Sequence, residues 1–136
     1  MKNRNLIHSD HWKTPLYFYS ELNKEFNFTF DPCPLHSDFD GLNISWKKRN
    51  FINPPYSRKL KELFILKALY ESKKNKLCVL LIPVSTSTKI FHEVILPNAF
   101  EIRFIKGRIN FEGVNSFGVS VKNKPPMHDS MIVIFK

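Results

Sequence analysis

The chain has 136 residues, 43% of them hydrophobic and 14% aromatic, with 21 Lys and Arg against 12 Asp and Glu and a formal net charge of +9. This length suits a single domain, which we expect over residues 1–136 with a core that needs no disulfides. The composition excludes a disordered tail. The basic excess favours a polyanionic partner, chiefly nucleic acid, although Lys- and Asn-rich chains from AT-rich genomes also carry such a charge.

Cysteine, histidine and apolar patterns exclude further classes of protein. Cys33 and Cys78 form no CxxC pair, so neither a zinc site nor a disulfide framework is indicated. The five histidines have no metal-ligand spacing, and we expect no metal. No apolar stretch approaches transmembrane length, and none resembles a signal peptide. These features predict a cytoplasmic protein without a membrane partner.

Helices and strands alternate along the chain. In chain order, the spacing of apolar residues predicts a helix over 16–26, a strand over 28–30, a loop over 33–49, a strand over 51–52, a helix over 59–73, a buried strand over 77–82, a short helix over 87–95 and strands over 100–105 and 130–135. This order predicts an α/β fold with a mostly parallel sheet and an antiparallel C-terminal strand.

Three predicted strands end in polar or turn-forming residues. These ends are Asp31-Pro32, Asn53-Pro54-Pro55-Tyr56 and Pro83-Val84-Ser85-Thr86. Ligands of open α/β sheets bind beyond the carboxyl ends of the strands. We therefore expect the functional site where these three segments meet.

The four residues from Asn53 to Tyr56 suit chemistry on a planar amine. Such an amine is a poor nucleophile, because its lone pair is delocalised into the ring. The side-chain carbonyl of Asn53 and the backbone carbonyl of Pro54 can accept its hydrogen bonds and free that lone pair. Pro54 and Pro55 stiffen the loop, and Tyr56 offers a flat face for an extruded base. The alternative is a plain Pro-Pro turn after a strand, but the preceding strand and the following helix favour the catalytic interpretation.

Several further segments occur in one order around this loop. They are Trp12-Lys13-Thr14-Pro15, Phe30-Asp31-Pro32-Cys33, Asp40-Gly41-Leu42 with Trp46, Phe51-Ile52-Asn53-Pro54-Pro55-Tyr56-Ser57, Leu81-Ile82-Pro83-Val84 with Ser85 to Thr88, Phe91, Gly107-Arg108-Ile109-Asn110-Phe111 and Pro125-Pro126 before Ser130. Together they resemble the small phage-type DNA N6-adenine methyltransferases, from Trp12 to Phe135. The resemblance implies an abbreviated Rossmann-like methyltransferase fold, S-adenosylmethionine as cofactor, DNA as substrate and the cytoplasm of a bacterium or phage-infected host.

The resemblance also implies cofactor-binding residues. Thr14 and Pro15 look like the segment that touches the methionine carboxylate of the cofactor, although a Thr cap before Pro is an ordinary helix start. Asp31 and Pro32 look like the end of the first strand, where an acid pairs with the cofactor's amino group or ribose. Asp40 resembles the acid that contacts the cofactor's adenine amine. Asp-Pro and Asp-Gly also mark simple turns, and this alternative stays open.

Basic residues after the catalytic loop are candidates for DNA contacts. Ser57, Arg58, Lys59 and Lys61 could hold phosphates beside a flipped base, and Arg108 is a similar candidate. The alternative for each is a solvated surface side chain.

The chain also departs from larger methyltransferases. It has no Gly-rich loop after Asp31, and the segment from Asp31 to Asn53 is too short for two strand–helix units. The cofactor pocket must therefore be abbreviated. No separate target-recognition domain is evident, so base specificity is expected from loops around 57–61 or 107–125.

Two other interpretations remain open from sequence. The same loop chemistry serves cytosine N4, RNA purines and protein glutamine, because each presents a planar nitrogen. A nucleic-acid-binding relative that has lost catalysis is the second interpretation. The positive charge and the extent of the resemblance favour DNA adenine.

Overall fold

A computed structural model describes residues 12–34, 37–114, 120–121 and 128–136. The strands are β1 (Trp12–Lys13), β2 (Arg49–Ile52), β3 (Leu77–Pro83), β4 (Glu101–Phe104), β5 (Glu112–Val114), β6 (Ser120–Val121) and β7 (Ser130–Phe135). The helices are α1 (Leu16–Phe26), α2 (Arg58–Ser72), a π-helical turn (Phe91–Ile95) and α3 (Leu96–Asn98), with a 3-10 turn at Gly41–Asn43.

The main sheet has the strand order β2-β3-β7-β4. β2 pairs with β3 in parallel, and β7 pairs antiparallel with both β3 and β4. The expected antiparallel C-terminal strand is confirmed, but the expectation of a mostly parallel sheet is wrong. β7 runs opposite to β2, β3 and β4. Because it lies between β3 and β4, it makes two of the three strand pairings of this sheet antiparallel.

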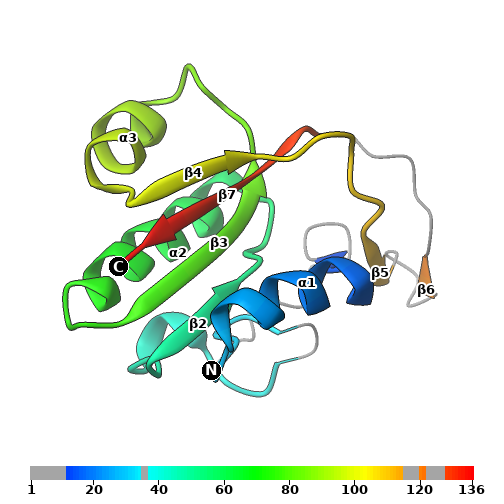
Figure 1. Ribbon diagram of the computed structural model, residues 1–136, viewed down its shortest axis with the longest axis horizontal. Coiled ribbons are helices and arrows are strands. Elements are labelled where there is room, and N and C mark those ends of the chain that lie inside the picture. The colour runs from blue at the N-terminus through cyan, green and yellow to red at the C-terminus, as the bar shows by residue number, and fades with distance from the viewer. Residues whose placement is uncertain (1–11, 35–36, 115–119, 122–127) are drawn as a thin grey trace.

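Helices cover both faces of this sheet. Figure 1 shows α1 in front of the sheet and α2 behind it. On β3, alternate residues serve the two faces: Leu77, Val79 and Leu81 pack with α1, while Cys78, Leu80 and Ile82 pack with α2. Because both faces are covered, every residue of β3 is buried, which explains its continuous apolar run.

A small second sheet lies at the right-hand end of the molecule in Figure 1. Its strand order is β1-β5-β6. β1 pairs antiparallel with β5, with Trp12 opposite Gly113. This pairing holds the chain just before α1 against a segment about 100 residues further on, and Trp12 is buried there.

Most expected elements are confirmed, with some shifts. α1 and β7 have the expected bounds, and β2, α2, β3 and β4 differ from expectation by one or two residues at their ends. The expected strand over 28–30 is reduced to a single parallel bridge between Phe30 and Asn50. The short helix begins at Lys89 and runs through the π-helical turn into α3. The small sheet is a feature that the sequence patterns did not indicate.

A fully buried carboxylate, Glu71, joins the end of α2 to the loop before β2. Its oxygens lie 2.9 Å from Lys67 Nζ and 2.5 Å from Lys76 Nζ, and Oε1 accepts a hydrogen bond from the Trp46 amide at 3.2 Å. Burial by itself would raise the pKa of Glu71. The hydrogen bonds from Lys76, Lys67 and the Trp46 amide outweigh burial and lower this pKa to about 2.

Glu71→Gln should therefore destabilise the protein by on the order of 3 kcal/mol at pH 7, because it leaves Lys67, Lys74 and Lys76 without their buried counter-charge. Because folding lowers the pKa of Glu71, its ionised carboxylate stabilises the fold at pH values above its ordinary pKa of 4.5. This stabilisation is lost as the pH falls from 4.5 towards 2. The difference between parent and variant in denaturant unfolding should shrink over the same range.

Glu21→Gln is the matched control, since Glu21 pairs with Lys24 in full solvent exposure and such pairs contribute about 0–1 kcal/mol. Equal losses in the two variants, or a loss at Glu71 that does not change with pH, would contradict this account of Glu71.

Candidate active site

The side chain of Asn53 is buried directly after β2 and is held by one of its two polar atoms. Its Nδ2 donates to the Trp12 carbonyl at 2.6 Å and to the Thr14 hydroxyl at 3.1 Å. A backbone carbonyl can only accept, so the atom facing Trp12 must be the amide nitrogen. The other atom, Oδ1, is buried and accepts no hydrogen bond from any residue that the structure describes.

Asn53 lines a cavity of about 150 Å³ on the α1 side of the sheet. The residues around this cavity come from β1, the start of α1, the end of β2 and the segment after Phe30, and they are Trp12, Lys13, Thr14, Leu16, Tyr19, Asp31, Cys33, Phe51 and Asn53. Four of the nine lining residues have aromatic or aliphatic side chains, and four have polar or charged ones. This combination is typical of ligand sites.

Asp31 is the acidic group of the cavity. Burial raises the pKa of its carboxyl to about 6, although the Cys33 amide, which donates to Oδ1 at 2.9 Å, opposes the rise. Burial and the nearby Asp31 charge also raise the pKa of Tyr19 and of the Cys33 thiol. Asp31 is therefore the group of this cavity whose charge changes near neutral pH.

Cys33 links the segment after Phe30 to the loop that begins at Asn53. Its thiol donates to the backbone carbonyl of Asn53 at 3.1 Å and is fully enclosed. The Asn53 residue is thus fixed at its main chain by Cys33 and at its side chain by Trp12 and Thr14. Both restraints orient the peptide that leads into Pro54.

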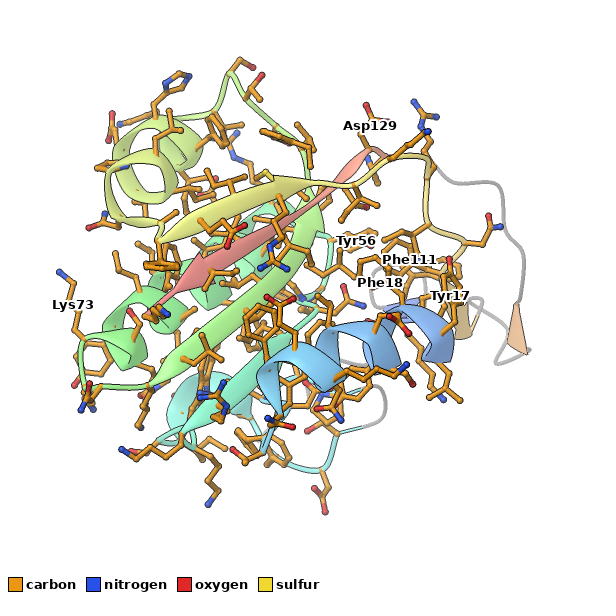
Figure 2. The ribbon with its side chains drawn as sticks, viewed as in Figure 1. Tyr17, Phe18, Tyr56, Lys73, Phe111 and Asp129 are labelled. Atoms are coloured by element: carbon orange, nitrogen blue, oxygen red, sulfur yellow. The ribbon has the colours of Figure 1, made fainter. Side chains whose placement is uncertain are left out.

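Tyr56 closes the loop among other rings. Pro54 and Pro55 are buried, and the Tyr56 ring is half-buried. It meets the rings of Phe111 and His128 edge-on, each at a centroid distance of 5.7 Å. In Figure 2, Tyr56 and Phe111 lie together beyond the carboxyl end of β3 and the start of β7, near the start of α1. Burial raises the pKa of the Tyr56 hydroxyl, which therefore stays neutral.

The structure brings together some of the expected cofactor residues and not others. Thr14, Asp31 and Asn53 line one cavity. Pro15 is buried as the residue before α1, and Pro32 is buried behind Asp31. Asp40 does not line this cavity. Its carboxylate accepts hydrogen bonds from the Leu42 amide at 3.0 Å and Asn43 Nδ2 at 2.9 Å, as in an Asp-Gly turn.

Four of the five expected DNA-contacting residues come directly after the loop, at the start of α2. Ser57 precedes α2, and Arg58, Lys59 and Lys61 occupy its first turn. Arg108 follows Gly107, whose φ of 76° favours glycine, and forms an exposed ion pair with Asp129 at 3.0 Å. Of the loop 107–125 expected to set base specificity, residues 115–119 and 122–125 lie outside the described part of the chain, as does Pro125-Pro126 of the resemblance.

Three residues that contribute to the site were not predicted from the sequence: Trp12, Tyr19 and Cys33. Trp12 acts through its backbone carbonyl, which side-chain patterns cannot reveal. For Tyr19, the sequence pattern predicted only a place in the helix over 16–26. Cys33, by contrast, follows Asp31-Pro32 directly, and its place in that segment was an available signal.

Two structural findings bear on cofactors and membranes. Within residues 12–34, 37–114, 120–121 and 128–136, no three His, Cys, Asp or Glu side chains gather closely enough to hold a metal ion. Among the same residues, no helix is long and apolar enough to span a bilayer.

The fold and the cavity define an α/β protein with an enzyme-type site at the carboxyl end of a parallel strand, built around a buried amide carbonyl. A family model for DNA N-6-adenine-methyltransferase (Dam) matches residues 3–136, so the chain belongs to this family. The resemblance to DNA N6-adenine methyltransferases found in the sequence is confirmed. A search of curated proteins gave no match.

Membership of this family makes the chain a DNA N6-adenine methyltransferase, an enzyme that methylates the exocyclic amine of adenine in DNA. This result decides against cytosine N4, RNA purines and protein glutamine as the main substrate.

The hold of Thr14 on Asn53 can be measured. Thr14→Val removes the hydroxyl that accepts from Asn53 Nδ2, and should lower the free energy of unfolding by about 1 kcal/mol. Thr14→Ser keeps the hydroxyl and should stay close to the parent in the same denaturant titration. Equal losses for Val and Ser would show that the hydroxyl contributes nothing.

Proposed function

We propose that this chain transfers the methyl group of S-adenosylmethionine to adenine N6 within an abbreviated Rossmann-like methyltransferase fold, with Asn53 as the acceptor for the reacting amine. The observation that carries the proposal is the buried Asn53 Oδ1, which lacks a donor among the described residues. Leaving such an atom unpaired costs about 1–3 kcal/mol. An N–H donor supplied by the substrate would remove this cost only when the target base is in place.

The proposed chemistry follows from the position of two carbonyl oxygens. Asn53 Oδ1 and the Pro54 carbonyl each accept one hydrogen of the N6 amine, which draws the nitrogen towards a tetrahedral shape. Its lone pair is then no longer shared with the ring and is directed at the methyl donor. Because Asn53 is held by Trp12, Thr14 and Cys33, little reorganisation accompanies the reaction.

The cavity beside Asn53 fits the methionine end of the cofactor. When bound, S-adenosylmethionine supplies a methyl group activated by its sulfonium. Asp31 can accept hydrogen bonds from an ammonium or hydroxyl group, and the Thr14 hydroxyl can donate to a carboxylate. The first amides of α1, around Leu16, have no acceptor within the helix and favour an anion. Asp40 lies outside the lining of this cavity and its oxygens cap a turn, so the proposed cofactor contacts do not include it.

Tyr56 is proposed to hold the flipped adenine. Its ring is buried on two sides by edge contacts with Phe111 and His128, which fix its plane. A fixed aromatic face captures an extruded base at a cost in entropy smaller than that of a mobile ring. The DNA around that base is proposed to contact five residues with basic or hydroxyl side chains, which are Ser57, Arg58, Lys59, Lys61 and Arg108.

Asn53→Ala tests the central role of this amide. The variant should methylate DNA on the order of 100-fold or more slowly, because one preorganised polar group is lost from the transition state. Affinity for the cofactor should change less. Single-turnover transfer of a labelled methyl group, followed by identification of the modified base, measures the effect. A variant that melts like the parent and transfers methyl at the parental rate would contradict the proposal.

Tyr56→Ala tests stacking in the same assay. It should weaken capture of the flipped base by roughly 1–3 kcal/mol, whereas Tyr56→Phe should be mild because the ring remains. Equal losses in both variants would indicate that the hydroxyl matters and that stacking is not the role of Tyr56.

Asp31 gives cofactor binding a defined pH dependence. Its carboxyl has a pKa of about 6, so it is ionised at pH 7.5 and becomes protonated as the pH falls through 6. Cofactor affinity should fall by up to about tenfold per pH unit below 6, because the protonated acid loses its charge. Calorimetric titration of Asp31→Asn should show weaker binding at pH 7.5 and a flatter profile. Asp38→Asn, at an exposed position outside the cavity, should keep the parental profile. A parental profile in Asp31→Asn would rule out this role.

A further inference from the structure

A second and larger hollow lies across the sheet from the Asn53 cavity. It is a groove of about 430 Å³ between the start of α2 and the segment that follows β3. Ile65, Ile82 and Met131 of its floor belong to the core on the α2 face, whereas Phe51 of the Asn53 cavity belongs to the core on the α1 face. The catalytic loop, between β2 and α2, therefore separates two hollows at the same edge of the sheet.

The rim of this groove is basic. Arg58 and Lys61 stand on the α2 wall and Lys89 on the opposite wall, against a single carboxylate, Glu62. Arg58 lies 3.3 Å from Glu62, with 77% of the Arg58 side chain exposed. Such exposed pairs contribute little, so an incoming anion can replace Glu62 as the partner of Arg58. The groove therefore presents positive charge from two sides.

Hydroxyl groups line the wall that carries Lys89. Ser85, Ser87 and Thr88 all border the groove. The Thr88 hydroxyl donates to the Ser85 carbonyl at 2.8 Å and accepts from the Phe91 amide at 3.3 Å, which fixes the turn. Ser87 is exposed on this fixed turn. Cations on both walls with hydroxyl donors between them match a phosphodiester, for which such groups are the usual protein partners.

We propose that this groove holds the sugar–phosphate backbone of the DNA strand that carries the target adenine, with Lys89 and Ser87 contacting phosphate from one wall and Arg58 and Lys61 from the other. The proposal rests on the proposed function, because it takes DNA as the substrate and Tyr56 as the point where the base leaves the stack. Arg58 follows Tyr56 by two residues, so the groove begins where the flipped nucleotide would rejoin its strand. The apolar floor packs against the sugar edge.

The groove binds backbone and not base edges, which gives it a measurable signature. Log affinity falls linearly with log salt, and each lost phosphate contact makes the magnitude of this slope smaller by about 0.9. Lys89→Gln should therefore reduce this slope by about 1 and bind DNA roughly tenfold more weakly at 0.1 M salt. Ser87→Ala should weaken binding by a smaller factor and leave the slope nearly unchanged, because the hydroxyl carries no charge.

Lys73→Gln is the matched control. Lys73 is exposed at the opposite end of α2, far from Tyr56 in Figure 2, and the substitution removes the same charge. Fluorescence anisotropy would compare DNA binding by the parent, Lys89→Gln and Lys73→Gln. One duplex contains the sequence that the enzyme methylates, a second duplex is scrambled, and each is titrated from 50 to 300 mM salt. Only Lys89→Gln should change the slope, and by the same amount on both duplexes, with parental cofactor affinity as proof of folding.

Three results would overturn the proposal: a parental slope in Lys89→Gln, equal changes in Lys89→Gln and Lys73→Gln, or weakening confined to the methylated sequence. The Asn53→Ala assay keeps the two proposals apart. If Asn53→Ala abolishes methylation while Lys89→Gln binds DNA like the parent, the catalytic proposal stands and the groove proposal fails.

Discussion

The side-chain amide of Asn53 is the constraint on which the site depends. Its nitrogen is fully used by Trp12 and Thr14, and its oxygen is left buried with no donor in the described part of the chain. A fold selected for stability alone would supply this oxygen with a hydrogen-bond donor, since a buried acceptor without a donor costs about 1–3 kcal/mol. The proposed role of Asn53 accounts for this cost, because the amine of the target base would supply the missing donor.

Three segments distant in sequence are organised by this residue. The Trp12 carbonyl accepts a hydrogen bond from Asn53, and the pairing of β1 with β5 holds Trp12 in place, so the small sheet helps to position the Asn53 side chain. Thr14 connects Asn53 to the start of α1, and Cys33 connects it to the segment after Phe30. The loop is therefore rigid through its neighbours as well as through its two prolines.

The mixed sheet places this loop between two hollows. β2 and β3 are parallel neighbours, so their carboxyl ends lie side by side, and helices on both faces leave one hollow on each side. The smaller one suits the charged end of a cofactor, and the basic one suits a phosphate backbone. The described residues thus place both surfaces at a single sheet edge.

The sequence predicted local features well and long-range ones poorly. α1, β3 and β7 follow from residue periodicity and buried apolar runs, which act over a few residues. The position of β7 between β3 and β4 depends on pairing across the whole chain, and no local pattern encodes it. Asn53, Thr14 and Asp31, which line one cavity, were predicted as site residues because their side-chain oxygens suit the expected chemistry. The contribution of Trp12 was not, because it comes from a backbone atom, and Asp40 caps a turn with the same atoms that could bind a ligand.

The most direct measurement of the central claim is a thermodynamic cycle between Asn53 and the amine that it is proposed to bind. Duplexes carrying either adenine or purine, which lacks the N6 amine, at the methylated position would be titrated against the parent and Asn53→Ala in the presence of a non-reactive cofactor analogue. The parent should prefer adenine over purine, and Asn53→Ala should lose most of this preference, since the two changes remove the same hydrogen bond. An identical preference in both proteins would show that Asn53 does not accept from the amine, and would contradict this account.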